Sequence, residues 1–221
     1  MAPSSHVFHS GRLDYIYPDQ VSKAGEKILV EETEEDGKET VIFSTNHPCL
    51  RVTHSKSKSK THPIAWSKIR RCADGAIIEF KDKKTLLHIV ELKKHVNRGK
   101  WKKAKEQFEG MLVNVLALGG ALGLGEFSEV IAYVAFQRDD LTATETSSTI
   151  SLKSETGTGR RLLPEGDDWR EGVVDLLHFE KVSLVKIQLD GKAHATHPLG
   201  AFSPHIPSTG AASTSQIRPK R

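Results

Sequence analysis

The chain has few of the residues on which several classes of protein depend. Cys49 and Cys72 are the only cysteines among 221 residues, so the sequence predicts neither a disulfide framework nor a cysteine-based zinc site. No apolar run approaches the roughly 18 residues that a membrane-spanning helix needs. The longest, residues 111–124, is interrupted by Asn114 and by glycines, and we expect it to form a buried helix.

The N-terminal stretch lacks the basic segment and following apolar run that mark a secretory signal. We therefore expect an intracellular, cytoplasmic protein with no membrane partner. With 37% hydrophobic residues, the chain is long enough for a substantial core. We expect an N-terminal arm (residues 1–20), a single domain (21–190) with a flexible insertion near 139–168, and a disordered tail (191–221).

Charge is unevenly distributed along the chain, although the net charge is only +4. Acidic residues gather at 31–36, whereas lysines and arginines gather at 56–71 and 93–105. Such clustering suits a polyanion-binding surface, because neutralising phosphates releases counterions. For any single lysine, a solvated surface position is the plainer interpretation.

Two segments in the middle of the chain predict paired strands. Residues 74–80 alternate, with Asp74 at their head, and residues 85–94 are apolar on both faces until Glu91 and Lys93. The second pattern indicates a central strand covered on both faces. Period-two geometry puts Glu91 and Lys93 side by side, and strand pairing can bring Asp74 to the same place.

A long helix and a further strand are expected next. Residues 100–122 carry apolar side chains at spacings of three and four, with Lys100, Lys103 and Gln107 on a neighbouring line. Residues 129–136 indicate a buried strand, and a helical crossover favours parallel pairing. The sequence therefore predicts an α/β fold with a mixed central sheet and one long flanking amphipathic helix.

Shorter elements are predicted around this core. They are a hairpin of residues 27–30 and 39–44, a strand at 49–54, a short strand at 149–153, a short helix at 169–177 and a last strand at 181–189. Lys56, Lys58 and Lys60 fall in an alternating serine–lysine segment that we expect to be a loop, either a plain linker or a phosphate-contacting surface.

An acid, sixteen residues and then Glu-x-Lys on a buried strand, followed by a basic amphipathic helix, resembles the PD-(D/E)xK nuclease superfamily. Asp74 matches the first acid, although Ala73 stands where the family often has proline. Glu91-Leu92-Lys93 matches the second half. Gln107 stands where λ-exonuclease-like members carry a glutamine, and Met111 where those members often have a tyrosine. The resemblance covers about residues 69–136.

The resemblance implies a restriction-endonuclease-like core and a metal-dependent nuclease that cleaves phosphodiester bonds of nucleic acid, with DNA favoured. It implies that Asp74, Glu91 and Lys93 are catalytic. Asp74, Glu91 and the main-chain carbonyl of Leu92 would hold Mg²⁺, for which Mn²⁺ can substitute. The expected substrate-binding residues are Lys56, Lys58, Lys60, Lys94, Lys100, Lys103 and Gln107.

The family often adds an acid from an earlier helix. No helix is predicted before the first strands, so Glu31, Glu32 and Glu39 are candidates, and none is assigned. The sequence also leaves open whether the protein acts alone, as a homo-oligomer or in a larger assembly.

Other interpretations of the short motif remain. Glu79-Phe80-Lys81 and Asp82-Lys83-Lys84 also fit the pattern, but the first lacks a correctly spaced acid and the second falls in the turn. Glu91 and Lys93 could be a solvated ion pair worth under about 1 kcal/mol. The functional alternative is an inactive member of the same fold that acts as a nucleic-acid-binding or protein-interaction module.

Overall fold

Two β-sheets and one long helix dominate the part of the chain that the computed structural model describes: residues 10–16, 20–32, 39–53, 71–141, 167–176 and 179–200. The central sheet contains β1 (Val21–Ala24), β4 (Cys49–Thr53), β5 (Gly75–Lys81), β6 (Lys84–Val96), β7 (Glu129–Asp139), β9 (Phe179–Gln188) and β8 (Val173–Leu176), in that spatial order. The small sheet contains β10 (His194–Pro198), β3 (Thr40–Ser44) and β2 (Lys27–Glu31). The helices are η1 (Ser10–Tyr15), α1 (Arg98–Leu122) and α3 (Asp167–Glu171).

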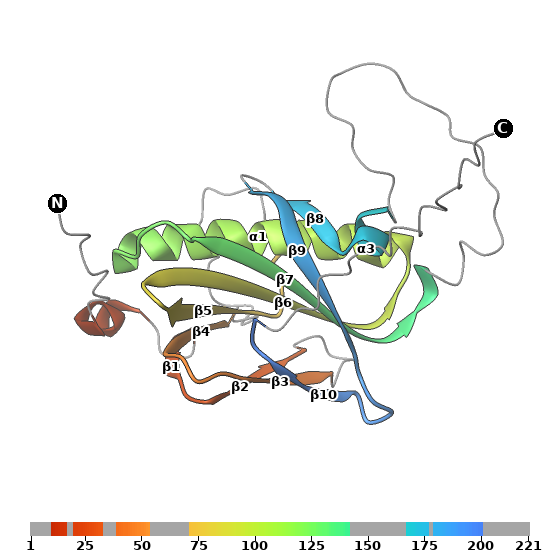
Figure 1. Cartoon of the computed structure of the whole chain (residues 1–221), viewed down its shortest axis with the longest axis horizontal. Helices are drawn as coiled ribbons and strands as arrows, with labels where there is room; N and C mark the ends of the chain where they lie inside the picture. Colours follow the sequence, from red (N-terminus) through yellow and green to blue (C-terminus); the bar gives the residue numbers. More distant parts are fainter. Residues whose placement is uncertain are drawn as a thin grey trace, which may run out of the picture.

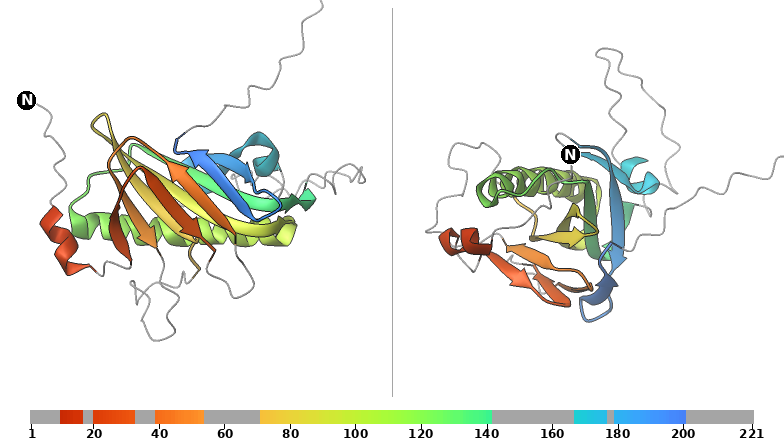
Figure 2. Two further views of the ribbon diagram at one scale, coloured as in Figure 1. Left: turned by 90° about the horizontal axis from the view of Figure 1, so that it is seen from below. Right: turned by 60° about the vertical axis from the view of Figure 1, so that its left-hand side comes forward.

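The molecule is layered, with α1 on one face of the central sheet and the small sheet on the other (Figure 1; Figure 2, right). The core beneath α1 includes Leu87 and Ile89 of β6 together with Phe108 of α1. The core beneath the small sheet includes Val90 of β6 and Phe43 of β3. Alternate residues of β6 therefore enter two different cores, which confirms the prediction of a strand covered on both faces.

The order of pairing explains how α1 and β7 come to lie beside β6. β4, β5 and β6 form an antiparallel meander, α1 crosses over the sheet, and β7 pairs with β6 in parallel. The predicted mixed sheet, flanking helix and parallel return are thus confirmed. α1 begins two residues earlier than predicted, because the Asn97 side chain caps it by accepting the Lys100 N–H at 3.0 Å.

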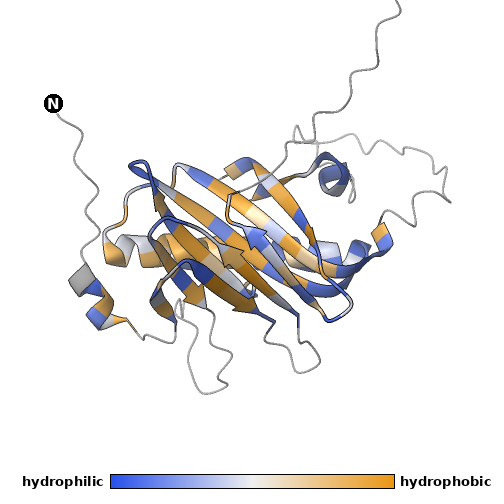
Figure 3. Ribbon diagram, turned by 60° about the horizontal axis from the view of Figure 1, so that its bottom comes forward, coloured by the Kyte–Doolittle hydropathy of each residue, from blue (hydrophilic) through white to orange (hydrophobic). Residues whose placement is uncertain are grey.

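Hydrophilic residues gather where β6 ends and α1 begins. In Figure 3 the first turns of α1 are hydrophilic, whereas the strands of the central sheet are mostly hydrophobic. Lys102 and Lys103 are exposed there, and Lys94 is exposed near the end of β6. None of the helices in the described ranges is long and apolar enough to cross a membrane.

The C-terminal elements differ from the prediction. The helix expected at residues 169–177 is the shorter α3, which ends at Glu171, and Gly172 with a left-handed φ of 69° leads into β8. The disorder expected from residue 191 is wrong for residues 191–200, where a turn leads into β10. β10 is poor in apolar residues, and its parallel backbone pairing with β3 supplies the order that composition did not indicate.

Four of the other predicted strands are confirmed, and one falls outside the described residues. The strands predicted at 27–30, 39–44 and 49–54 are confirmed as β2, β3 and β4, and β9 corresponds to the strand predicted at 181–189. η1 lies within the expected N-terminal arm, and β1 was not predicted. The short strand expected at 149–153, and most of the insertion near 139–168, fall outside the described residues.

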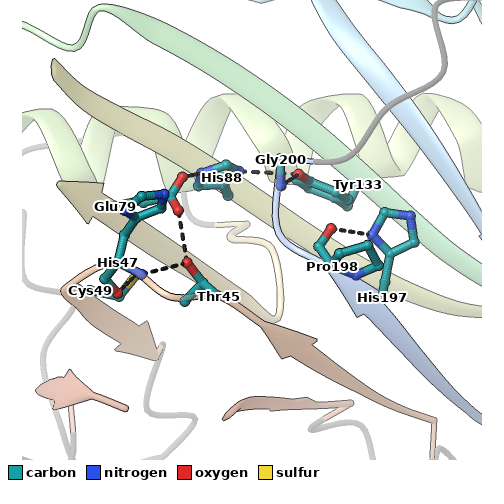
Figure 4. Close-up of polar contacts among 9 residues, drawn as sticks. All are labelled: Thr45, His47, Cys49, Glu79, His88, Tyr133, His197, Pro198 and Gly200. Carbon is teal, nitrogen blue, oxygen red and sulfur yellow. Dashed lines mark hydrogen bonds and ion pairs between the residues drawn. The ribbon is translucent and has the colours of Figure 1, made fainter. Parts of the chain in front are cut away.

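A buried polar network fastens the small sheet to the central sheet (Figure 4). His88 lies between two partners, with Nδ1 3.2 Å from Tyr133 Oη and Nε2 3.2 Å from Glu79 Oε2. The Thr45 hydroxyl, just after β3, donates to Glu79 Oε1 at 2.9 Å. The Gly200 N–H, just after β10, donates to Tyr133 Oη at 3.0 Å. The network therefore holds both the β3 and β10 ends of the small sheet.

Candidate functional site

Asp74, Glu91 and Lys93 meet at the start of β5. The β5–β6 register ends at the pair of Gly75 and Val90, so Asp74 and Glu91 each stand one residue beyond it. Asp74 Oδ2 accepts the Leu92 N–H at 2.9 Å, and the Lys93 ammonium pairs with Glu91 Oε1. The three residues that the sequence predicts to act together therefore occupy one corner of the central sheet.

This pair of Glu91 and Lys93 is not a solvated one. The Glu91 side chain is 0% exposed and that of Lys93 12%, which excludes the solvated ion pair as an explanation. Burial, reinforced by the charge of Asp74, raises the pKa of Glu91 well above its usual range. Burial opposes the charge on Lys93 as well, but attraction to Glu91 outweighs it and raises the pKa of Lys93. Among the described residues, none is a hydrogen-bond partner of the buried Glu91 Oε2.

The Leu92 carbonyl is directed toward the same corner. In a β-strand the N–H and C=O of one residue point to the same neighbouring strand. Because the Leu92 N–H reaches Asp74 Oδ2, the Leu92 carbonyl also faces the edge where Asp74 lies. β5 begins only at Gly75, while β6 continues to Val96, so β5 does not pair with this stretch of β6.

α1 holds the segment that leads to Asp74. The Ala73 N–H donates to the Gln107 carbonyl at 3.0 Å, and Gln107 Nε2 donates to the Cys72 carbonyl at 3.4 Å. Asn114 Nδ2 lies 2.7 Å from Cys72 Sγ. Gln107 is thus engaged with backbone two residues from Asp74, where it positions the acid. Its contact with substrate stays a prediction.

Two further carboxyl groups reach the corner from the small sheet. The Glu32 N–H donates to the Glu39 carbonyl at 2.9 Å, and the two side chains are hydrogen-bonded to each other. Burial, this hydrogen bond and the nearby charge of Asp74 raise the pKa of Glu32 to about 8. Glu31, the third acid left unassigned from the sequence, is exposed. We call Glu32, Glu39, Asp74, Glu91 and Lys93 the acidic corner.

Close packing of the two sheets brings these acids within reach. Gly75 directly follows Asp74, and a Cβ atom there would lie 3.1 Å from Val30 Cγ1 of β2. Glycine thus permits β2 to lie against the start of β5. The sequence shows that Glu32 and Glu39 flank the two strands of the hairpin. It does not indicate how the small sheet packs against the central sheet.

The donor set of the acidic corner suits a hard divalent cation. Carboxylate oxygens and a main-chain carbonyl are the ligands that Mg²⁺ and Mn²⁺ take. The orphaned Glu91 Oε2 is a buried acceptor that such an ion would satisfy. As the side chains stand, no group of three or more His, Cys, Asp or Glu in the described ranges is gathered around one metal position. The Lys93 ammonium and the Glu32–Glu39 hydrogen bond occupy carboxylate oxygens instead.

No protein-family model, curated protein or solved structure matches this chain. Its function must be inferred from the acidic corner and the surface around it.

Three of the predicted substrate-binding lysines lie beyond the corner, toward the end of β6. Lys94 is exposed and borders an open pocket of about 390 Å³. His95, Gln137, Arg138, Leu189, Asp190 and Gly191 line the rest of this pocket. Lys100 Nζ lies 3.3 Å from His95 Nδ1, and Lys103 is exposed on the next turn of α1. Lys56, Lys58 and Lys60 fall outside the described residues, so their role stays a prediction.

Proposed function

We propose that this protein is a metal-dependent nuclease that hydrolyses phosphodiester bonds of nucleic acid, with DNA as the favoured substrate. The observation that carries the proposal is the convergence of Asp74, Glu91 and Lys93 in a buried corner where Glu91 Oε2 has no partner. Perturbed, buried titratable groups of this kind concentrate at functional sites. The β4–β5–β6 meander, α1 and β7 would form a restriction-endonuclease-like core.

Asp74, Glu91 and the Leu92 carbonyl would hold Mg²⁺, with Mn²⁺ as a substitute. The ion would supply Lewis-acid stabilisation of phosphoryl charge and a water that is more readily deprotonated. In the proposed reaction, the water oxygen bonds to phosphorus and loses one proton to solvent, the P–O bond to one sugar oxygen breaks, and that oxygen takes up a proton from solvent. Lys93 would leave Glu91 Oε1 and donate its hydrogen bonds to the phosphoryl oxygens as negative charge builds up on them.

The site's burial strengthens these interactions. Glu91 is fully buried and Asp74 is 6% exposed, so their charges act through a medium less polarisable than water. The cost of burying them is recovered only when positive charge is present. The buried Lys93 provides part of that charge, and a divalent cation held by the carboxylates would supply the rest.

Exposed and half-buried lysines would position the substrate without reading its sequence. Lys94, Lys100 and Lys103 stand where β6 ends and α1 begins, a few residues along the chain from Lys93. Phosphate contacts of this kind add affinity and orientation but little base specificity.

The second candidate is an inactive binding module of the same fold. The Glu91–Lys93 ion pair favours it, because the lysine already neutralises the carboxylate without a metal. The basic surface at the start of α1 would serve either function.

Cleavage assays separate these two candidates. The purified protein is incubated with linear double-stranded, circular and single-stranded DNA and with RNA, in Mg²⁺, in Mn²⁺ or in EDTA. We expect cleavage with either metal, none in EDTA and none by Asp74→Asn. Asp82→Asn is the matched control, because this exposed turn residue undergoes the same chemical change. Intact products on every substrate, together with retained nucleic-acid binding, would establish the binding module instead.

A further inference from the structure

The side of α1 that faces away from the sheet changes character halfway along the helix. In the first half, the residues that recur on this side at spacings of three and four are charged: Lys102, Glu106 and Glu109. The same side continues through Val113, Leu116 and Gly120, and residues 110–125 contain no charged side chain. A helix face that meets water usually carries charged or polar residues. The second half of α1 therefore lacks the feature that marks a solvated surface.

The described part of the chain leaves this second half open. Leu116 is the exposed large hydrophobic side chain of the described ranges, at 37% exposure. Ala117, Gly120 and Ala121 are exposed beside it, and a Cβ atom at Gly120 would meet nothing within 4 Å. We call Val113, Leu116, Ala117, Gly120 and Ala121 the apolar face. Contiguous exposed apolar residues of this kind mark interaction sites.

Two opposite charges stand at the two ends of the apolar face. Arg12 of η1 covers the C-terminal end of α1, where its Nη1 donates to the Ala121 carbonyl at 3.5 Å. Glu109 lies at the other end, and Lys105, the cation whose charge acts on it, is paired with Asp168. Within the described ranges, neither Arg12 nor Glu109 forms an ion pair. Each charge is therefore available to an opposite charge on another molecule.

The apolar face is complementary in shape to a second copy of itself. Centring an antiparallel pair of α1 helices between Leu116 and Ala117 places these two residues level with each other across the pair. Val113 of each copy then lies level with Gly120 of the other. Large side chains thus face small ones, which lets the two helices approach closely. The central contact contains no charge, so its formation carries no penalty for removing charges from water.

The flanking charges fit the same arrangement. Glu109 of each copy lies level with Leu124 of the other, beside the helix end that Arg12 covers. Two pairs of opposite charges, related by a two-fold axis, therefore border the apolar contact. Charge complementarity at the rim of an interface steers association and fixes its register.

We propose that the apolar face is a dimer interface, in which two copies of this chain pack their α1 helices antiparallel about a two-fold axis and Arg12 of each copy pairs with Glu109 of the other. A two-fold axis is the commonest symmetry of protein dimers. The inference does not depend on the proposed function. One stretch of helix is smaller than the roughly 1,200 Å² of a standard interface, so we expect a weak dimer that dissociates on dilution.

Sedimentation equilibrium over a wide range of protein concentration tests the interface. We expect a monomer–dimer equilibrium for the wild type and an at least about tenfold larger dissociation constant for Leu116→Glu, which would bury an unpaired charge in the contact. Leu116 is exposed in the single chain, so this variant should fold, and circular dichroism checks that it does. Gly99→Glu is the matched control, because it adds one carboxylate to an exposed position of α1 outside the apolar face. It should associate like the wild type.

Two outcomes of this experiment would overturn the proposal. A wild type that stays monomeric at every concentration would leave the apolar face to a different partner. A dimer that Leu116→Glu leaves intact would show that association uses another surface.

Charge reversal tests the two-fold arrangement by a readout that general destabilisation does not produce. Arg12→Glu and Glu109→Arg should each weaken association, because each puts like charges at both ends of the contact. The double variant should recover most of the wild-type affinity, since the opposite charges are then exchanged and not removed. A double variant that associates more weakly than either single variant would contradict the pairing and overturn the proposed dimer.

Discussion

The strands β5 and β6 carry two buried polar clusters that contrast in how well their groups are satisfied. In the network of Figure 4, both oxygens of Glu79 have donors, Thr45 and His88. In the acidic corner, the described part of the chain gives Glu91 one partner, Lys93, and gives its other oxygen none. Burial acts to raise the pKa of both glutamates. Hydrogen bonds from His88 and Thr45 outweigh it at Glu79, whose pKa is lowered, whereas the pKa of Glu91 stays raised.

This difference separates a structural cluster from a candidate functional one. Around Glu79 the folded chain supplies what the carboxylate needs, and in doing so it fastens the small sheet. Around Glu91 the chain brings one donor, Lys93, together with further acids, and such an arrangement costs stability unless a ligand completes it. Polar burial alone would have placed both clusters in the same class. The count of satisfied oxygens is what distinguishes them.

The largest expected effect follows from removing charge in the corner. Glu91→Gln or Asp74→Asn should lower cleavage by at least about 10³-fold, because each removes a carboxylate of the proposed metal site. Each change is nearly isosteric, and loss of the Glu91–Lys93 pair is offset by relief of the repulsion between buried carboxylates, so the free energy of unfolding should change by only about 1 kcal/mol. Initial rates at saturating Mg²⁺ and a denaturant titration measure the two quantities. Near-normal cleavage by either variant would contradict the assignment.

The next effect concerns Lys93. Lys93→Ala should lower turnover by about 10²- to 10³-fold, the usual cost of losing one donor to a developing oxyanion. Mn²⁺ binding should persist, because the carboxylates remain. Lys94→Ala, which changes an exposed neighbour, is the control and should affect substrate binding more than turnover. If Lys94→Ala were the variant that lost turnover, the catalytic role would move to that residue.

A change in the Glu79–His88 network should lower stability and leave cleavage nearly unchanged, which is the opposite of the effect expected in the acidic corner. Glu79→Gln breaks a buried pair with His88 and should cost about 3 kcal/mol of stability. For a chain of this size that is a fall in Tm of about 6–12 °C. Cleavage well below Tm should be close to that of the wild type. A variant that stays stable but loses cleavage would show that this cluster acts in catalysis and is not a structural one.

The same cluster predicts a pH dependence of stability. The pKa of Glu79 is lower in the folded protein than its ordinary value of 4.5, so its contribution is present above about pH 4.5. That contribution should be lost as the pH falls through the lowered folded value. The stability difference between wild type and Glu79→Gln should therefore shrink in acid. A difference that stays constant down to strongly acidic pH would contradict the assigned hydrogen bonds.

The smallest effect concerns the basic surface. Changing Lys100, Lys102 and Lys103 to Gln should weaken nucleic-acid binding for all sequences alike. The slope of log affinity against log salt should fall by roughly 0.7 to 0.9 per lost phosphate contact. Lys81, Lys83 and Lys84 are exposed at the other end of β6 and provide a control with the same loss of charge. Binding measured in a Glu91→Gln background keeps cleavage out of the titration. Equal effects from both triple variants would show that nucleic acid does not favour the α1 end.

Part of this arrangement could be predicted from sequence patterns, for physical reasons. Period-two alternation fixes which side chains share a strand face, so the meeting of Asp74, Glu91 and Lys93 followed from pairing of neighbouring strands. The crossover helix made parallel pairing of β7 predictable. Glu32 and Glu39 could not be placed in the same way. Their position depends on how the small sheet packs, which contacts between residues distant in sequence determine.

The missed strand β10 shows the same limit. Its order comes from backbone pairing with β3, more than 150 residues earlier in the chain, and its side chains give no alternating apolar signal. The Glu79–His88 network was likewise invisible, because Thr45 and Gly200 complete it from the small-sheet side. Local periodicity predicts faces and neighbours, whereas the partners that satisfy a buried group often come from elsewhere in the chain.

The most direct test is an anomalous diffraction experiment on crystals of the wild-type protein soaked in Mn²⁺. Metal binding at the acidic corner predicts an anomalous difference peak within coordination distance of Asp74, Glu91 and the Leu92 carbonyl, with none at Glu79. Full occupancy by Mn²⁺ at surface sites, with no peak at the corner and Lys93 still paired with Glu91, would contradict the account.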